Sequence, residues 1–562
     1  MNKLPYFSRG ESRQIHFEER KRFSAQTFLY LYICLLVILF FGLILRLFQL
    51  TIVKGSYYRQ LSEQNRIREI LIEPKRGKII DRKGLTIAEN KEADIDEKTE
   101  RLTSSRIYNE AEAIAHILGY RQKADKNDFK DGACVNKLKT GDKIGKKGVE
   151  KLFDCQLRGK YGKKLIEVDA KGSNLRTLSL FPPVDGETIQ LALDLELQNI
   201  AYGLIKDKKA TIIATKPQTG EVLILASSPS FNPQDFEDEN ANTTALYLKS
   251  KEKPMFNRAT EGTYAPGSVF KLILAAGALE EKKIDEKFTV EDTGILKAGP
   301  LEFGNWYFLQ YGKTDGTVDI VKALRRSNDI FFYKIGDLLT PTKIKKWAEI
   351  FGYGAKTNIG FEEAEGLVPS AFWKKEVIKD RWYLGDTYNL SIGQGYLLVT
   401  PLQVNQVTSV FANDGNLCKP QLLKYQISDI KYQNCKKLPI SQKTLDLVRQ
   451  GMKEACTSGG TGWPFFQFSV TSSQSSVNTK SSDSKLTTEN RPLTTDIRVG
   501  CKTGTAESHG KDTLPHAWFT VFAPFDKPEI ALTVLLEEAG QGSDVAAPIA
   551  KEILKIYFER KE

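Results

Sequence analysis

An uncharged, strongly apolar segment near the N-terminus constrains the fold of this chain more than any other feature. Residues 23–45 carry no charged side chain, and the stretch from Phe28 to Leu45 is almost entirely Leu, Ile, Val, Phe and Tyr. About 20 apolar residues in a helix span the hydrocarbon core of a bilayer. We therefore predict a transmembrane helix over residues 23–48 rather than a helix of a soluble core.

The flanks of this segment predict a retained anchor with a fixed orientation. A cleaved signal peptide has a shorter apolar region that ends in small residues, whereas Arg46-Leu-Phe-Gln49 follows here. Arg20, Lys21 and Arg22 precede the segment, and positive residues favour the cytoplasmic side of a membrane. We expect a single-pass protein of the cytoplasmic (inner) membrane, with residues 1–22 in the cytoplasm and the remainder in the periplasm or outside the cell.

The overall composition excludes few functions, but it argues against nucleic-acid binding. The 562 residues are 41% hydrophobic and 27% charged, which is ordinary for globular domains, and the length allows more than one domain. The net charge of +11 comes from scattered residues, without a recognisable nucleic-acid-binding module. No nucleic-acid partner is expected, and a mildly basic surface suits an anionic cell envelope.

The seven cysteines leave their pairing open. Cys34 lies in the apolar segment, and Cys134 with Cys155 and Cys418 with Cys435 are close enough in sequence for local disulfides. Disulfides are expected in an oxidising compartment, but unpaired buried thiols are an equally simple interpretation. No C-x-x-C pair and no histidine cluster at ligand spacing is present, so neither a metal site nor a cofactor is expected.

The sequence divides into a polar region and a longer region with regular apolar patterns. Residues 49–185 are lysine-rich and poor in apolar runs, and we expect an extended pedestal that lifts the next domain off the membrane. Residues 186–562 have strand patterns near both ends and helical patterns between them, which favours an α+β domain with one antiparallel sheet. The expected strands are 189–194, 210–214, 221–226, 497–506, 517–522 and 530–537, and the expected helices include 195–206, 269–280 and 545–560. Residues 469–495, rich in Ser, Thr, Asn and Lys, are expected to form a low-complexity surface loop.

Three short motifs follow one another along the second region: Ser268-Val-Phe-Lys271, Ser327-Asn-Asp329 and Lys502-Thr-Gly504. Each is weak alone, because S-x-x-K and K-T-G also recur elsewhere in this lysine-rich chain. Their order and context distinguish these copies, since Ser268 opens an apolar helical run and Lys502 lies in a strand-like stretch. This ordered set is typical of penicillin-recognising serine enzymes.

The residue types in these motifs suit acyl transfer without histidine. A serine hydroxyl becomes nucleophilic when a neighbouring base accepts its proton, and Ser268 and Lys271 are one helical turn apart. Lysine is a base only when neutral, so its pKa of about 10.4 must fall through burial or a nearby positive charge. Lys502 supplies that charge if its strand runs beside the Ser268 helix. The helix N-terminus favours an alkoxide at Ser268, and Ser327 is suited to pass a proton to the leaving amine.

The last motif suits a substrate that ends in a carboxylate. The Lys502 ammonium and the hydroxyls of Thr503 and Thr505 match such a group, and Gly504 on an edge strand lets a substrate backbone come close. Two backbone amides, those of Ser268 and Thr505, are expected to bind the tetrahedral oxyanion. None of the four histidines can be assembled into a Ser-His-Asp arrangement.

Together these residues resemble the class B penicillin-binding proteins, which are monofunctional D,D-transpeptidases of peptidoglycan synthesis. The similarity extends over nearly the whole chain. Further matching stretches are 76–82, 217–222, 257–260, 264–268, 331–333, 392–395, 400–403 and 516–519. The run from Gly385 to Gly395 is most similar to the elongation-type branch, the penicillin-binding protein 2 type.

The resemblance implies a penicillin-binding or serine β-lactamase-like fold and a role for each motif residue. By this resemblance Ser268 is the acylated nucleophile, Lys271 the general base and Ser327 the proton shuttle; Asp329 stands where Asn is common; and Lys502, Thr503 and Thr505 hold the donor carboxylate. The implied partners are D-Ala-D-Ala stem peptides on the lipid-linked precursor polymer, β-lactams as covalent inhibitors, and a membrane glycosyltransferase of the elongation machinery. A D,D-carboxypeptidase side activity is compatible with the same site.

Three alternative functions remain. A division-type transpeptidase has the same motifs. A membrane-anchored serine β-lactamase or β-lactam sensor has the same catalytic fold; steady penicillin hydrolysis distinguishes the lactamase from the stable adduct of a transpeptidase. A non-catalytic envelope scaffold predicts that Ser268→Ala leaves cell shape intact.

Overall fold

The computed structural model describes residues 25–91, 94–96, 101–103, 105–129, 138–169, 173–424, 434–475, 492–508 and 513–560. These residues belong to two compact units. The first comprises Met1–Leu71 with Lys163–Pro182, and the second comprises Ile72–Gly162 with Pro183–Glu562. Cys134 lies outside the described residues, and so does most of the predicted loop 469–495.

The first unit contains the predicted apolar helix. Helix α1 (Ala25–Phe48) continues through a π-helical turn (Gln49–Val53) to α2 (Gly55–Arg66). In the described part of the chain, the span Gln26–Val53 is the one helix long and apolar enough to cross a membrane, with a mean hydropathy of 2.9 and none of its surface covered by protein. Strands β9 (Gly162–Val168) and β10 (Asn174–Phe181) form an antiparallel ribbon in the same unit.

In the second unit, the chain up to residue 190 contributes a small four-stranded sheet. Its strand order is β11-β2-β3-β6. The strands are β2 (Ile79–Ile80), β3 (Thr86–Asn90), β6 (Arg106–Tyr108) and β11 (Ile189–Gln190), and helices α3 (Ala111–Leu118), α4 (Gly148–Leu152) and α5 (Asp154–Arg158) accompany them. The predicted strand 189–194 is too long, because Leu191 makes only an isolated bridge to Leu423 and a helix starts at Leu195.

A buried ionic cluster fastens these elements. Arg76 Nε and Arg106 Nε donate to the two carboxylate oxygens of Glu150 at 2.7 and 2.9 Å. Nearby, Arg121 Nη2 donates to Glu237 Oε1 at 2.7 Å. Glu150 is fully buried, so its charge depends on these arginines rather than on water. Glu237 belongs to α7 (Gln234–Glu237), so the cluster joins segments that are more than 70 residues apart.

The second half of this unit is the predicted α+β domain. Its five-stranded sheet has the order β13-β12-β24-β23-β22, and every neighbouring pair is antiparallel. The strands are β12 (Ala210–Thr215), β13 (Val222–Ser228), β22 (Gly500–Ala506), β23 (His516–Ala523) and β24 (Ile530–Leu536). The prediction of one antiparallel sheet built from both ends of the region is confirmed.

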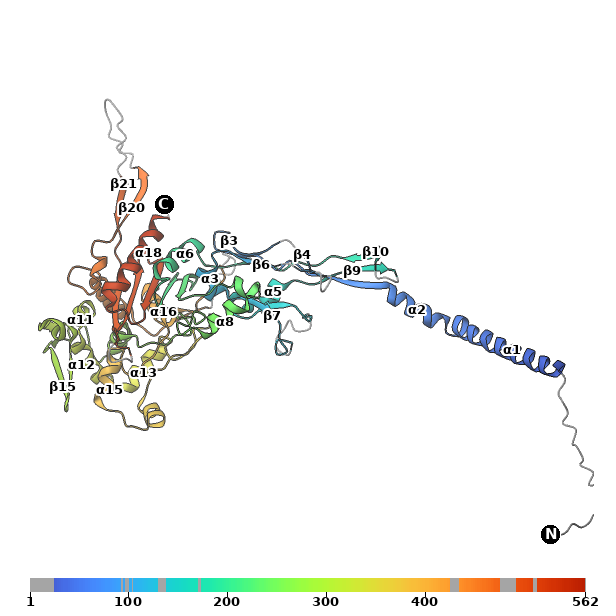
Figure 1. The fold of residues 1–562 in the computed structure, drawn as a ribbon. Helices are drawn as coiled ribbons and strands as arrows, with labels where there is room; N and C mark the ends of the chain where they lie inside the picture. The colour runs from blue at the N-terminus through green and yellow to red at the C-terminus, as the bar shows by residue number, and fades with distance from the viewer. Residues whose placement is uncertain are drawn as a thin grey trace, which may run out of the picture. The chain divides into compact units, whose positions relative to one another are not determined.

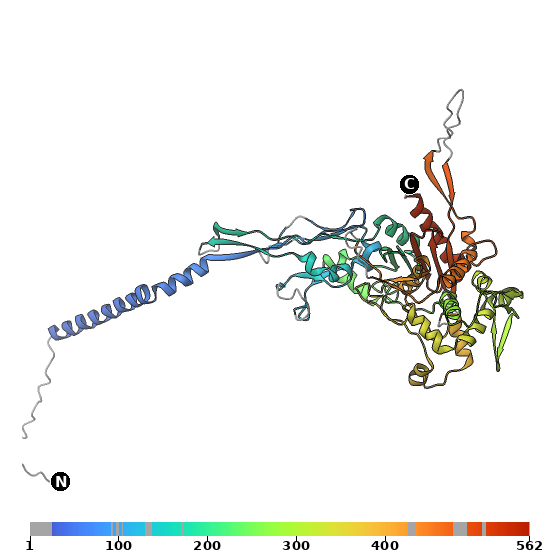
Figure 2. The ribbon, with the colours of Figure 1, turned by 180° about the vertical axis from the view of Figure 1, so that it is seen from behind.

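Helices cover both faces of the sheet, as period-two burial requires. Helices α6 (Leu195–Ile205) and α18 (Ala547–Glu559) pack on one face, where Phe519 and Val521 point. Helices α9 (Lys271–Glu280) and α16 (Pro401–Ala412) belong to the core on the other face, with Trp518 and Phe522. The C-terminal strands and α18 are red in Figure 1, and Figure 2 shows the same elements from behind.

The second unit contains further helices and several two-stranded ribbons. The helices are α8 (Ala241–Lys249), a 3₁₀ turn η3 (Gly267–Phe270), α10 (Trp306–Tyr311), α11 (Ile320–Arg326), α12 (Asp329–Leu339), α13 (Pro341–Ile350), α14 (Ala371–Trp373), α15 (Leu384–Ser391) and α17 (Gln442–Ala455). Two-stranded ribbons are formed by β7 (Arg121–Lys123) with β8 (Lys143–Gly145), β14 (Val290–Glu291) with β17 (Thr317–Val318), β15 (Ile295–Ala298) with β16 (Leu301–Gly304), and β18 (Asn416–Cys418) with β19 (Cys435–Lys437).

The prediction of a loop over residues 469–495 is wrong at both ends. Strands β20 (Ser469–Ser475) and β21 (Pro492–Asp496) pair antiparallel as a hairpin. Both strands are labelled in Figure 1, where their ribbons are orange. Its strands consist mostly of Ser and Thr, so they show no alternation of apolar and polar residues. Thr retains strand propensity without such a pattern, and composition alone therefore hid the ribbon.

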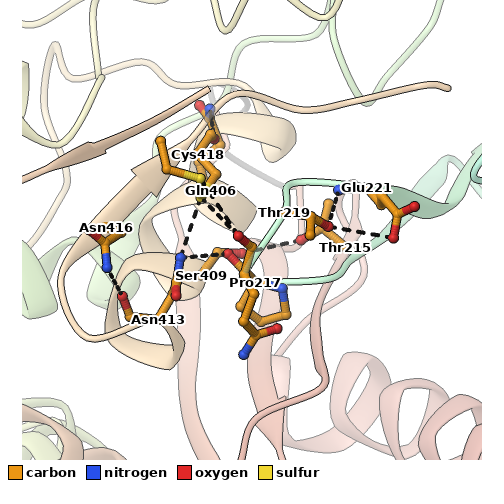
Figure 3. The surroundings of a disulfide bond; sticks show 11 residues. Thr215, Pro217, Thr219, Glu221, Gln406, Ser409, Asn413, Asn416 and Cys418 are labelled. Carbon is orange, nitrogen blue, oxygen red and sulfur yellow. Dashed lines mark hydrogen bonds between the residues drawn. A yellow bond between two sulfur atoms is a disulfide. The ribbon is translucent and has the colours of Figure 1, made fainter. Parts of the chain in front are cut away.

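Two disulfides are described, of which one matches a proposed pairing. Cys418 and Cys435 are bonded, and Figure 3 shows Asn413 beside Cys418, where its amide donates to the Pro217 carbonyl. The second bond joins Cys456 to Cys501, 45 residues apart, and is not among the pairings expected from the sequence. It fastens the end of α17 to the strand that carries Lys502.

Candidate active site

Ser268 and Lys271 lie on a tight turn at the start of an apolar helix. The helix predicted over 269–280 begins as a 3₁₀ turn over Gly267–Phe270 and continues as α9. In 3₁₀ geometry residues i and i+3 eclipse one another, so both side chains share one edge of the turn. The Gly267 amide donates to the Gly393 carbonyl at 2.9 Å. This bond fixes the turn against the distant segment that contains Gly393. The Ser268 hydroxyl is half-buried and makes no hydrogen bond within the described residues.

Lys271 is completely buried and is surrounded by the central motif. Its Nζ donates to Asp329 Oδ1 at 2.6 Å, to the Ser327 carbonyl at 2.8 Å and to Ser327 Oγ at 3.3 Å. The ring centroid of Phe332 is 5.2 Å away. The predicted S-x-x-K lysine and central triplet are therefore in direct contact.

Ser327 joins the second motif to the third. It has a left-handed backbone conformation, with φ 54° and ψ 38°, between α11 and α12. A non-glycine residue in this region is uncommon, and such residues concentrate at functional sites. The fully buried Lys502 donates to Ser327 Oγ at 2.9 Å and to the Thr503 carbonyl at 2.9 Å. One hydroxyl thus lies between two lysine amines.

Burial pushes both amines toward their neutral forms. Burial lowers the pKa of Lys271 from its usual 10.5, and the Asp329 carboxylate opposes that shift. Burial and then the charge of Lys271 lower the pKa of Lys502 well below its usual value, again opposed by Asp329. With one carboxylate beside two amines, the site disfavours two simultaneous positive charges, as required for a lysine base.

Gly504 is required by packing within the protein. A Cβ at this position would lie 2.9 Å from the Trp518 Cβ and 3.1 Å from the Pro266 carbonyl oxygen. Any side chain here would therefore push β22 away from the segment that precedes Ser268. The close approach of a substrate backbone, the reason expected for this glycine from the sequence, stays a prediction.

Two residues that were not predicted as site residues also contact the edge strand β22. Thr503 Oγ1 donates to Thr461 Oγ1 at 2.8 Å, and Gln394 Nε2 donates to the Thr505 carbonyl at 3.3 Å. Thr461 lies in the Gly459–Gly462 run, whose glycine content was the available signal. The Thr505 side chain is exposed at the edge of the sheet, where β22 has no partner on its outer side among the described residues.

The predicted site residues therefore converge from three separate stretches of sequence. Lys271, Ser327, Asp329 and Lys502 form one hydrogen-bonded chain, and Thr503 to Thr505 continue along the adjoining strand edge. His516 instead accepts a hydrogen bond at Nδ1 from the Glu538 amide at 3.1 Å.

Comparison with known proteins agrees with this geometry. Residues 210–555 match the family model for the penicillin binding protein transpeptidase domain, and residues 99–191 match that for the penicillin-binding protein dimerisation domain. A curated relative, peptidoglycan D,D-transpeptidase MrdA of Haemophilus influenzae, is 30% identical over 479 residues, which cover 81% of this chain and 70% of the relative.

Two solved structures are similar over most of their length. Pseudomonas aeruginosa PBP2 in complex with WCK 5153 has 28% identity and a TM-score of 0.71, covering 87% of this chain and 96% of that one. PBP2 of Helicobacter pylori, solved as a complex with MreC, has 26% identity and a TM-score of 0.71, covering 88% and 99%. The site combines a serine and two buried lysines with a glycine-containing edge strand. Because the family model also matches well over half of the residues, the chain belongs to the penicillin-binding protein transpeptidase family.

Proposed function

We propose that this protein is a peptidoglycan D,D-transpeptidase of the elongation type, which cross-links stem peptides through an acyl-enzyme on Ser268. The observation that carries the proposal is the convergence of the Lys271 and Lys502 amines on the Ser327 hydroxyl. This arrangement supplies a buried base, a proton relay and a cationic edge in one place.

The acylation step follows from these positions. Lys271, in its neutral form, accepts the proton of Ser268 as Oγ attacks the carbonyl carbon of the penultimate D-alanine. The backbone amides of Ser268 and Thr505 stabilise the oxyanion. As the C–N bond breaks, the proton passes from Lys271 through Ser327 to the departing amine, and the terminal D-alanine leaves.

Transfer to the acceptor reverses this path. The acceptor amine attacks the ester carbonyl, loses a proton through Ser327 to Lys271, and forms a new amide bond. The Ser268 oxygen then leaves and takes back the proton, so that the enzyme is restored. Water in place of the amine gives the D,D-carboxypeptidase side reaction.

The substrate carboxylate completes the charge balance of the site. Burial and then the charge of Lys271 lower the pKa of Lys502. A carboxylate held by Thr503 and Thr505 raises the pKa of Lys502, and the resulting ammonium favours a neutral Lys271. Correct substrate therefore helps to form the base that acts on it.

The anchor and the pedestal place this chemistry outside the cell in our proposal. Residues 1–22 are a cytoplasmic tail, 23–48 the transmembrane anchor, 49–185 the pedestal and 186–562 the transpeptidase domain. The H. pylori relative was solved with MreC, which supports an elongation role. A membrane glycosyltransferase supplies the polymer that is cross-linked.

The activity is tested with the full chain in detergent, a donor pentapeptide ending in D-Ala-D-Ala and an acceptor amine. We expect one D-alanine released for each cross-linked or hydrolysed donor peptide, with all products measured by mass spectrometry, and no reaction after penicillin treatment. Steady hydrolysis of penicillin, or no D-alanine release from any donor, would contradict a transpeptidase.

The pH dependence of acylation provides a separate test. Because burial lowers the pKa of Lys271 from 10.5, its neutral fraction grows as pH rises through a value below the normal lysine range. The second-order rate constant for acylation by a penicillin should therefore rise with pH along one limb and then level off before pH 10.5. A rate that keeps rising to pH 11, or one without any limb, would show that Lys271 is not the base.

A further inference from the structure

The Ser327–Asp329 triplet is held by a buried polar cluster from residues 292–315, which no catalytic motif includes. At its centre is Asp292, 3% exposed. Its carboxylate accepts hydrogen bonds from Asn305 Nδ2 at 2.8 Å, Asn328 Nδ2 at 2.9 Å and the Asp315 amide at 2.8 Å. The Gly294 amide donates to its other oxygen at 2.9 Å. Four donors satisfy a charge that burial would otherwise disfavour, so the cluster rigidly joins the 292–315 segment to the triplet.

Two consecutive residues of this segment form hydrogen bonds with Asp329, one with its backbone amide and one with its carboxylate. Asn305 Oδ1 accepts from the Asp329 backbone amide at 3.1 Å, and the Trp306 backbone amide donates to Asp329 Oδ2 at 3.0 Å. The other carboxylate oxygen, Oδ1, accepts from Lys271 Nζ at 2.6 Å. One oxygen of Asp329 is thus fixed by the Trp306 amide, which leaves the other facing Lys271.

This orientation is not provided by the triplet alone. Asp329 is the first residue of α12, and Asn328 caps that helix by accepting from the Phe331 amide at 2.9 Å. An aspartate near a helix start is free to turn toward the unbonded amides of its own helix. The Trp306 amide competes with that conformation and holds the carboxylate toward the base.

We propose that Asn305 and the backbone amide of Trp306 are positioning elements of the transpeptidase, because they aim the Asp329 carboxylate at Lys271 and so control the charge and placement of the general base. The inference rests on the proposed function. It assigns a catalytic purpose to the 292–315 segment, which contacts Asp329, the hydrogen-bond partner of Lys271.

The chain offers a matched pair of variants that isolates the Trp306 amide. Trp306 is the first residue of α10, where proline is tolerated because its missing N–H is not needed within the helix. Asn305 has φ −81° and ψ 136°, a conformation that a following proline permits. Trp306→Pro therefore removes the N–H bond to Asp329, whereas Trp306→Ala removes the same indole and keeps the N–H.

The measurement is the pH profile of acylation by a fluorescent penicillin, with the full chain in detergent. Asp329 opposes the lowering of the pKa of Lys271. A misdirected carboxylate should therefore move the acid limb, the part of the profile in which the rate constant rises with pH, to lower pH. We expect this shift in Trp306→Pro and not in Trp306→Ala. The plateau rate of Trp306→Pro should also fall by up to about 100-fold, the cost of an ångström-scale misplacement. Identical profiles for the two variants would overturn the proposal.

A second pair covers the case in which Trp306→Pro does not fold. Asn305→Ala should move the acid limb in the same direction. Its control is Asn405→Ala, since Asn405 is also 0% exposed and bonds to the Ile213 and Ala531 carbonyls. The control should lower stability without moving the limb; equal behaviour of both variants would refute the role of Asn305.

A double variant tests whether the effect passes through Asp329. Asp329→Asn should shift the limb by itself, and adding Trp306→Pro should shift it no further, because residues that act through one another are non-additive. An additional shift of similar size would contradict this path. If the wild-type protein is not acylated at Ser268 at all, the proposed function itself fails, which separates the two outcomes.

Discussion

Lys271→Met should slow the acylation of Ser268 by a fluorescent penicillin by about 10³-fold, in the middle of the range for loss of a general base. Methionine has similar length and fits buried space, so the change removes the proton acceptor with little loss of packing. The acid limb of the pH profile should disappear with the amine. Gel fluorescence over time gives the rate, and intact mass gives the stoichiometry.

The controls separate catalysis from folding. Ser268→Ala should take up no label, which sets the baseline. Lys374→Met removes another buried amine, 3% exposed and paired with Asp386 at 2.7 Å, and should label within about threefold of the wild type. Labelling of Lys271→Met at the wild-type rate would disprove the base assignment, and so would an adduct on any other residue.

Glu150→Ala should lower the free energy of unfolding of the second unit by about 3–5 kcal/mol, the usual cost of removing one partner from a buried ion pair. Burial would by itself raise the pKa of Glu150, but the charges of Arg76 and Arg106 lower it to about 2. The carboxylate is therefore ionised at neutral pH. Its removal leaves Arg106 buried without a counter-charge at hydrogen-bond distance.

Urea denaturation followed by fluorescence measures this loss. Glu89→Ala is the matched control, because Glu89 pairs with Lys78 at 2.9 Å but both side chains are substantially exposed. Such surface pairs contribute about 0–1 kcal/mol. A loss below about 1 kcal/mol in Glu150→Ala, equal to that of the control, would show that the cluster does not stabilise the fold.

Local patterns in the sequence predicted much of the catalytic domain. The run of aromatic and β-branched residues in Ala517–Phe522 identified β23, and the apolar run after Ser268 identified α9. The order of three motifs was sufficient to select Lys271, Ser327 and Lys502, which the structure brings into contact. The helix and strand signals succeed because each depends on neighbouring residues, and the motif set is informative because three local patterns occur in one order over residues 268–504.

Features that depend on distant contacts were not predictable from one sequence. The pairing of Cys456 with Cys501 spans 45 residues, and Asp292 contacts Asn328 across 36. Neither separation has a local pattern. The glycine-rich run around Thr461 did not predict that its hydroxyl lies 2.8 Å from that of Thr503. The hairpin β20–β21 was missed for the opposite reason: its pairing is local, but its strands have no apolar face.

The Cys456–Cys501 bond has a consequence for when the enzyme matures. Cys501 immediately precedes Lys502, and protein disulfides do not persist in a reducing cytosol. If the transpeptidase domain lies outside the cell, as proposed above, a nascent chain reaches the far side of the membrane before this disulfide has formed. Export and thiol oxidation then become steps in building the catalytic centre, so that cells lacking an oxidising pathway should accumulate full-length but poorly acylated protein.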